Sequence, residues 1–260
     1  MDPFHAAFAL NIPAEEIVIN LMYSSLHAAF DEGSSTRSQQ FVWSLGVALI
    51  VHVAGLIGMV WGDPVWFSSK TPFNLLLMWL LLLINQQKRD TAFFLFMILG
   101  FFTGMFTEMI GVHTGILFGN YAYGTILGPS WKAVPFLMGL NWFVTVFIAA
   151  GTAQLILEHF MPNDSGMMRA RIVKFLLIPL TGAAIATFFD WIMEPAAVSL
   201  GFWTWAGDGT IPMLNYISWF AISWLLLTAG MLLGMDVRNR FSIPLLLIQS
   251  SFFFLLRLFF

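Results

Sequence analysis

The sequence predicts an all-α, polytopic integral membrane protein, and two observations lead to this fold class. Only 10% of the 260 residues are charged and 59% are hydrophobic, whereas a soluble domain has about 25% charged residues. Several apolar stretches also approach or exceed the ~20 residues that a helix needs to cross a bilayer. The net charge is only -3, so composition gives no reason to expect a nucleic-acid partner.

The N-terminal 40 residues are expected to lie outside the membrane-spanning domain, which we place at 41–260. Between residues 13 and 30, Ile17 and Leu21 fall on one helical face, with Glu16 and Asn20 on the other. This pattern predicts an amphipathic helix in the membrane interface. The polar stretch DEGSSTRSQQ then forms a linker.

About seven membrane-spanning helices are predicted in the rest of the chain from its apolar runs. Their expected bounds are 41–62, 72–87, 91–112, 135–157, 171–194, 213–234 and 241–260.

The distribution of Lys and Arg predicts how these helices are oriented, because cytoplasmic loops carry an excess of both. If the N-terminus is cytoplasmic, eight of the 11 basic residues fall on that side and three on the other. The eight are Arg37, Lys88, Arg89, Arg169, Arg171, Lys174, Arg238 and Arg240. We therefore expect a protein of the inner cell membrane whose connections between helices three and four, and five and six, lie outside.

These two outer connections resemble each other and predict an internal repeat. Glu108 precedes the segment GNYAY by 11 residues, and Asp190 precedes GFWTW by the same interval. Both units begin in a helix that runs toward the outer side. Helices three and four would therefore form a parallel repeat with helices five and six, and sites in repeat proteins often lie at the repeat interface.

Helical spacing places Glu108 on an inward face. Gly100, Gly104 and Glu108 recur every four residues, and GFFTG is a G-x-x-x-G pattern that allows a second helix to approach closely. We therefore expect the Glu108 side chain to point into the bundle.

Three acidic residues are the candidate catalytic groups, namely Glu108, Asp190 and Glu194. Carboxyl groups at membrane depth are costly, so they are paired, buried against protein or functional. A carboxylic acid that stays protonated can act as a general acid. Glu194 follows Asp190 by four residues and would share its face, but Pro195 argues against a continuous helix there. The alternative is a structural role, in which Glu108 or Asp190 forms hydrogen bonds with Asn, Thr or Trp side chains.

No cofactor or metal is expected. The chain has no Cys, its His residues lack metal-ligand spacing, and it has no nucleotide-binding or Ser-His-Asp motif.

The stretch TEMIGVHTGILFGNYAYGTILGPSWKAVP, with the second connection, resembles a family of carotenoid biosynthesis membrane proteins. That family includes carotenoid 1,2-hydratases and bacterioruberin-type hydratases. Matching residues in the first motif are Glu108, Gly111, Thr114, Gly115, Phe118, Gly119, Tyr121, Tyr123, Leu127, Gly128, Pro129, Val134, Pro135 and Trp142. The second, weaker motif consists of Trp203, Trp205, Pro212, Asn215 and Trp219. The resemblance covers roughly residues 91 to 235.

The resemblance implies cofactor-independent addition of water across the terminal double bond of an acyclic carotenoid. Glu108 or Asp190 would protonate the alkene and the other would take a proton from water, in an order that stays open. Aromatic rings would stabilise the tertiary carbocation. The candidate substrate-binding residues are Tyr121, Tyr123, Asn141, Trp142, Trp203, Trp205 and Asn215. Expected partners are membrane lipid, the carotenoid and other enzymes of carotenoid synthesis.

Other functions are compatible with the same residues. A carotenoid end-group cyclase or isomerase would use the same acid and exclude water. A small membrane transporter would account for the repeat, and a purely structural or assembly protein is the remaining alternative.

Overall fold

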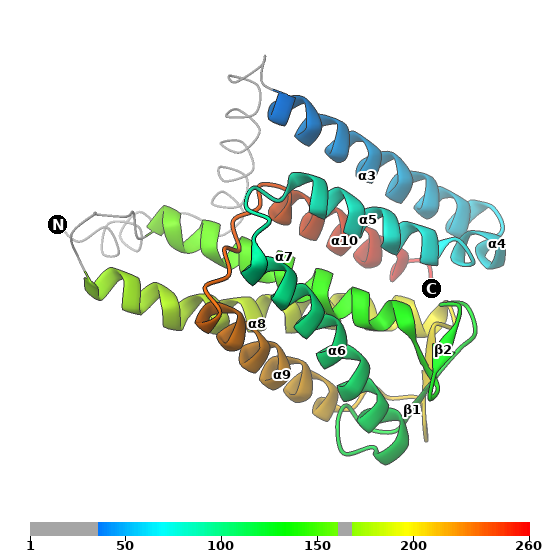
Figure 1. Ribbon diagram of the computed structural model, residues 1–260. Coiled ribbons are helices and arrows are strands. Elements are labelled where there is room, and N and C mark those ends of the chain that lie inside the picture. The colour runs from blue at the N-terminus through cyan, green and yellow to red at the C-terminus, as the bar shows by residue number, and fades with distance from the viewer. Residues whose placement is uncertain (1–35, 161–167) are drawn as a thin grey trace, which may run out of the picture.

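The computed structural model describes residues 36–160 and 168–260, and these residues form a bundle of helices (Figure 1). The helices are α3 (Thr36–Trp61), α4 (Pro64–Ser68), α5 (Thr71–Asn85), α6 (Thr91–Thr114), α7 (Phe136–Phe160), α8 (Met168–Ser199), α9 (Met213–Leu232) and α10 (Ser242–Leu256). The short strands are β1 (Tyr121–Tyr123), β2 (Ser130–Trp131), β3 (Val134–Pro135) and β4 (Trp203–Trp205). The amphipathic helix expected at 13–30 lies outside the described residues.

The prediction of a polytopic α-helical membrane protein is confirmed. Six segments of the described chain are helical, long and apolar enough to span a bilayer. They belong to α3, to α4 and α5 together, and to α6, α7, α8 and α9. The helix α10 is apolar but shorter, with 15 residues. The first part of the bundle differs from expectation in two ways: α3 begins at Thr36, within the predicted linker, and the short α4 precedes α5. The helix α10 ends at Leu256 and not at residue 260.

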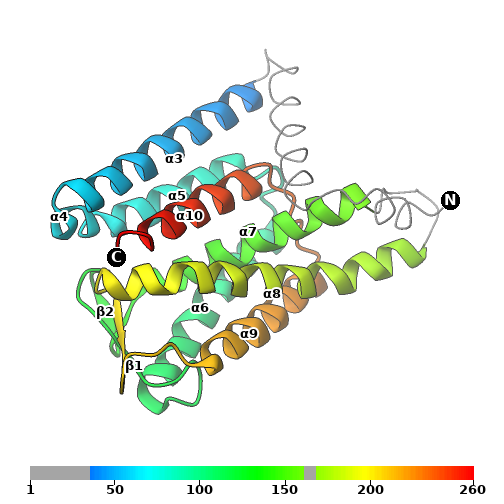
Figure 2. The ribbon, with the colours of Figure 1, turned by 180° about the vertical axis from the view of Figure 1, so that it is seen from behind.

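The helix α7 occupies the centre of the bundle. Seventy-two per cent of its apolar membrane-spanning stretch is buried, compared with 22% of the stretch formed by α4 and α5. It contacts α5, α6, α8, α9 and α10. In Figures 1 and 2, α3, α5 and α10 lie on one side of α7, and α6, α8 and α9 lie on the other. The second group carries both halves of the predicted repeat.

The strands β1 and β4 join the two predicted repeat units directly. They form an antiparallel pair in which Tyr121 faces Trp205, Ala122 faces Thr204 and Tyr123 faces Trp203. An offset of 82 positions maps each strand onto the other and converts the first of these pairs into the last. A two-fold axis through the middle pair gives this register, so the strand pairing supports the predicted repeat.

The helix α8 runs through a proline at which its end was predicted. It contains Pro179 and Pro195 and continues to Ser199, whose hydroxyl donates a hydrogen bond to the Pro195 carbonyl. The expectation that the helix ends at residue 194 was wrong, because the conformational bias before proline yields where the surrounding structure favours a helix. Asp190 and Glu194 therefore lie one turn apart on the same face.

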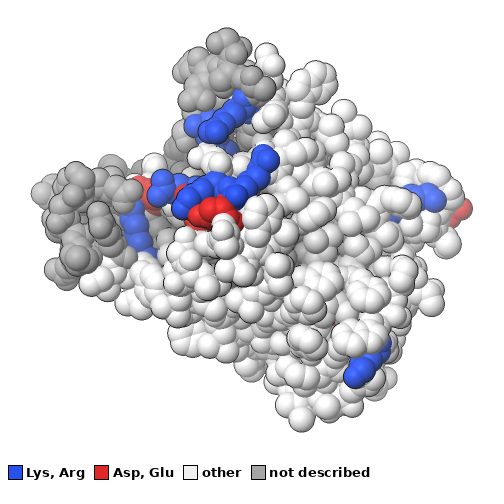
Figure 3. Space-filling view, viewed as in Figure 1, with Lys and Arg blue, Asp and Glu red and all other residues white. Residues whose placement is uncertain are grey.

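Basic residues gather at the end of the bundle where α5 joins α6 and α9 joins α10 (Figure 3). The two connections are held together there, since Gln86 Nε2 donates to the Asp236 carbonyl at 3.1 Å and Asn239 Nδ2 donates to Gln86 Oε1 at 3.0 Å. The strands β1 and β4 lie at the opposite end of the bundle (Figure 2). That the basic end of the bundle faces the cytoplasm stays a prediction.

Cysteine labelling tests this orientation, because the chain has no Cys of its own. Ser130 and Asp208 are exposed in the two connections near the strands, and Gln87 is exposed at the basic end. A membrane-impermeant maleimide should label Ser130→Cys and Asp208→Cys in intact spheroplasts, and Gln87→Cys only after permeabilisation. The reverse pattern would invert the orientation.

Candidate functional site

The three candidate carboxyl groups line one small cavity. It lies between α6, α8 and α9 beside the strands β1 and β4, and its volume is about 20 Å³. A cavity of this size holds about one water molecule. The lining residues are Glu108, Phe118, Tyr121, Tyr123, Met138, Asp190, Met193, Glu194, Trp203, Trp205, Asn215 and Trp219. No basic side chain is among these lining residues, so neutral hydrogen-bond donors are the partners that the lining offers the acids.

Glu108 accepts hydrogen bonds from three aromatic side chains. Its Oε2 accepts from the hydroxyls of Tyr121 and Tyr123, the latter at 2.6 Å, and its Oε1 accepts from Trp142 Nε1 at 2.7 Å. Alternate residues of a strand point to the same face, so β1 delivers both tyrosines to one carboxyl group. Three donors on two oxygens favour the ionised form of Glu108.

The two tyrosines are fixed as donors by their surroundings. Burial raises the pKa of both the Tyr121 and the Tyr123 hydroxyl above its ordinary value, and the charge of Glu108 raises it further. Each hydroxyl therefore keeps its proton and directs it at Glu108 over the whole physiological pH range.

Glu194 has the corresponding environment in the second repeat unit. The indole Nε1 atoms of Trp203 and Trp205 both donate to its Oε2, at 3.1 and 3.0 Å. Among the described residues, only Asn215 Nδ2 approaches its Oε1, at 3.5 Å. The strand β4 thus serves Glu194 as β1 serves Glu108. The sequence offset had paired Glu108 with Asp190, so the hydrogen bonds identify a second counterpart one turn further along α8.

Asp190 differs from the other two acids because one of its oxygens has no partner. Its Oδ2 accepts from Asn215 Nδ2 at 2.7 Å. Its Oδ1 is buried and accepts no hydrogen bond from any described residue. An unmatched buried carboxylate oxygen is costly, so this atom is where a proton or a ligand is accommodated.

Two glycines of α6 hold the site together. An added Cβ at Gly104 would lie 2.6 Å from the Trp142 Cβ, and one at Gly100 would lie 3.2 Å from the Phe143 Cβ. The predicted close approach at GFFTG is therefore made by α7. It brings the indole N–H edge of Trp142 to Glu108, and a face of that indole stacks on Trp219 of α9 with centroids 3.9 Å apart and planes 3° apart.

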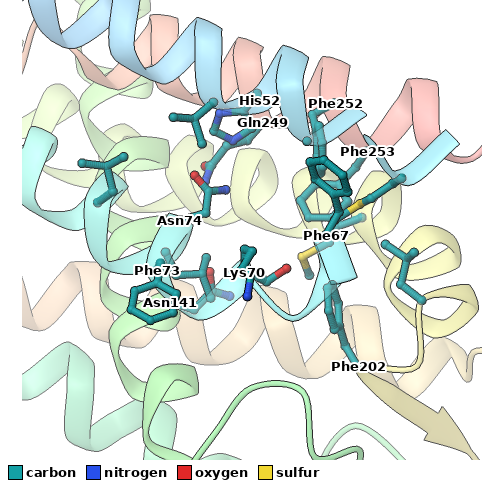
Figure 4. A pocket seen from close by; sticks show the side chains of 18 of the residues that line it. His52, Phe67, Lys70, Phe73, Asn74, Asn141, Phe202, Gln249, Phe252 and Phe253 are labelled. Carbon is teal, nitrogen blue, oxygen red and sulfur yellow. The ribbon is translucent and has the colours of Figure 1, made fainter. Parts of the chain in front are cut away.

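A second, larger cavity (Figure 4) shares part of its lining with the small one. It has a volume of about 340 Å³, within the range of ligand-binding pockets. Side chains of α3, α4, α5, α7, α8 and α10 line it, and it shares Met138, Met193 and Trp203 with the small cavity. The exposed side chains of Ile50 and Phe73 lie at its margin, so it opens to the apolar outer surface of the bundle.

The structure brings most of the predicted site residues together. Eight of them line the small cavity, namely Glu108, Asp190, Glu194, Tyr121, Tyr123, Trp203, Trp205 and Asn215. Trp142 contacts Glu108 without lining that cavity. Asn141 lines the larger cavity instead, because adjacent helical residues point in directions about 100° apart.

The sequence patterns did not predict the larger cavity. Its polar members include His52, Asn74 and Gln249, which are isolated within long apolar stretches of α3, α5 and α10. Their position inside predicted membrane spans is a signal that was available, since polar residues at that depth mark functional positions.

Comparison with known proteins relates the chain to carotenoid synthesis. The profile of the family described as carotenoid biosynthesis protein matches residues 70–259. Bisanhydrobacterioruberin hydratase from Haloarcula japonica is 29% identical over 115 residues, which are 43% of this chain and 36% of that protein. The chain thus matches about a third of the length of this relative. No solved structure matches the chain.

Substitution of Gly104 tests the packing that positions Trp142. Gly104→Ala should lower the melting temperature in detergent, because the new methyl group overlaps Trp142 and overpacking costs about 1–3 kcal/mol. Gly46→Ala is the matched control, since nothing lies within 4 Å of its added Cβ and Ala is the better helix former. Equal melting temperatures for the two variants would contradict the assigned packing.

Proposed function

The chain belongs to the family of carotenoid biosynthesis proteins, and from this membership we propose that it is a hydratase. It adds water across the terminal double bond of an acyclic carotenoid end group and forms a tertiary alcohol. The observation that carries the proposal is the small cavity, in which an acid with an unpartnered oxygen meets two hydrogen-bonded carboxylates. The hydratase named in the comparison supports the same reaction class.

Asp190 is the general acid in this proposal. Its Oδ1 has no donor among the described residues, so the protonated form of the group satisfies this oxygen where the ionised form does not. The proton lies at a cavity with room for little more than one water molecule. Transfer to the less substituted alkene carbon leaves a cation on the tertiary carbon.

Glu108 stabilises that cation as a fixed negative charge. Its three donors hold the carboxylate in place and offset part of the cost of burying its charge. Rings of Tyr121, Tyr123, Trp203 and Trp205 surround the same space, and aromatic faces attract cations. Groups oriented before the reaction stabilise developing charge without reorganising.

Glu194 completes the reaction as the base. Water attacks the tertiary carbon and loses a proton to Oε1, the carboxylate oxygen of Glu194 that has only the long contact with Asn215. The proton then returns to Asp190, which shares Asn215 as a hydrogen-bond donor. The net change is one alkene and one water converted to one alcohol, with the three acids restored.

The substrate reaches the site from the bilayer. A carotenoid is soluble in lipid, and the larger cavity opens among exposed apolar side chains and meets the small cavity at Met138, Met193 and Trp203. An end group enters by this route while the rest of the polyene stays in the membrane. We place the site at the outer end of the helices, in line with the distribution of basic residues.

Product analysis tests the reaction. In a host that accumulates an acyclic carotene, the protein should produce a more polar pigment that is heavier by one water, with a nearly unchanged polyene spectrum. Growth in oxygen-18 water should label the new hydroxyl group. A product of unchanged mass would identify a cyclase or isomerase instead, and an unaltered pigment would remove the hydratase proposal.

Substitution of the acids tests their roles. Asp190→Asn should lower turnover about 10²–10⁴-fold, the typical contribution of general acid–base catalysis, and Glu194→Gln and Glu108→Gln should also lower it strongly. Asp208→Asn is the control, because Asp208 is an exposed acid in the same connection as β4. Pigment formation is measured per amount of membrane-inserted protein. Near-normal turnover in Asp190→Asn would eliminate that residue as the acid.

A further inference from the structure

The larger cavity contains amide groups whose hydrogen-bonding capacity is unused. Asn74 Oδ1 is buried without a hydrogen-bond partner in the described part of the chain. Gln249 is buried, and neither its side chain nor that of Asn141 makes a hydrogen bond within the described residues. Buried amides without partners are costly, so their presence indicates a ligand that supplies the partner.

A histidine adds an acceptor to the same side of the cavity. His52 is buried, and its Nδ1 lies 2.8 Å from the Ala48 carbonyl. A carbonyl oxygen only accepts, so Nδ1 carries the hydrogen and Nε2 is left as an acceptor. In the view of Figure 4, His52, Gln249 and Asn74 lie on one side of the cavity.

Aromatic side chains also line the cavity. Phe67, Phe252 and Phe253 belong to this aromatic wall (Figure 4), and Phe252 contacts the polar group directly, since its ring centroid lies 5.3 Å from that of His52. A pure hydrocarbon would fit this wall but would leave the amides and the imidazole without hydrogen-bond partners. A water file would satisfy the polar group but would not account for a volume of about 340 Å³ enclosed mainly by apolar side chains.

We propose that the larger cavity binds a carotenoid segment that carries a hydroxyl group, and that Asn74 and Gln249 bind this hydroxyl. The proposal rests on the proposed function for the carotenoid class of the ligand. An amide supplies both a donor and an acceptor and so matches a hydroxyl group, which is also both.

The position of the polar group defines where the hydroxyl lies on the ligand. Neither Asn74, Gln249 nor His52 lines the small cavity with the three acids. A double bond placed at Asp190 therefore leaves the hydroxyl further along the chain, toward the lipid. The hydroxyl belongs to the substrate before hydration, and the new tertiary hydroxyl forms at a separate place.

Binding measurements on the full chain test the assignment. Asp190→Asn protein in detergent, which blocks turnover, is titrated with an acyclic carotene and with a derivative that has an added hydroxyl and keeps its terminal double bond. Quenching of tryptophan fluorescence reports binding, because Trp66 and Trp203 line the cavity. The hydroxylated probe should bind about five- to tenfold more tightly, the effect of one hydrogen bond.

Two independent variants identify the groups responsible. Asn74→Leu and Gln249→Met, each in the Asp190→Asn background, replace an amide by an apolar side chain of similar size. Each should reduce the preference for the hydroxylated probe toward unity while the carotene still binds, which also shows that the variant is folded. Equal binding of both probes before substitution, or an unchanged preference in both variants, would overturn the proposal.

A third probe distinguishes the two sources of the hydroxyl group. This probe is the hydrated product, whose terminal double bond is gone. If the active protein converts the hydroxylated alkene with a higher kcat/KM than the carotene, the cavity binds a hydroxyl group of the substrate. If only the product binds tightly and inhibits competitively, the cavity retains the hydroxyl that the reaction forms, and the assignment to the substrate falls.

The same experiments separate this proposal from the hydratase proposal. Conversion of neither alkene, with the binding preference intact, removes the hydratase and leaves the cavity assignment standing. Hydration of the carotene with no preference in binding removes the cavity assignment and leaves the hydratase.

Discussion

The structure depends on the burial of three carboxyl groups at one small cavity, which has no basic side chain among its described lining residues. Each of these acids is at least 97% buried, and an unpaired charge is costly in such surroundings. The neutral hydroxyl, indole and amide donors of Tyr121, Tyr123, Trp142, Trp203, Trp205 and Asn215 therefore have to reach them. Much of the local fold follows from the need to bring these donors in.

The two connections with short strands meet this need. The acids lie on helices, and the spacing of residues within a helix does not bring two aromatic side chains of another segment to one carboxyl group. A strand does, since its alternate residues share a face. Pairing β1 with β4 closes the hydrogen bonds of both segments, which irregular backbone at the edge of a membrane otherwise leaves open. The repeat therefore places a donor strand opposite an acid in each half.

Differences between the two halves give the site its chemical asymmetry. Tyrosines donate to Glu108 and tryptophans to Glu194, while Asp190 keeps one oxygen unmatched. A perfectly symmetric site would give equivalent acids on both sides of the axis, whereas the proposed reaction needs one donor and one acceptor of a proton. The larger cavity adds to this asymmetry, because it adjoins the small cavity on one side through Met138, Met193 and Trp203.

The sequence by itself determined the fold class, the approximate positions of the helices, the three acids and the aromatic pairs, because each depends on composition or on spacing along the chain. Apolar length marks a membrane helix, and the interval of 11 residues after Glu108 and Asp190 marks the repeat. Only the tertiary structure decided which acid receives which donors, that α8 passes through Pro195, and that His52, Asn74 and Gln249 share a cavity. Those residues lie on three different helices, and only packing brings them to one space.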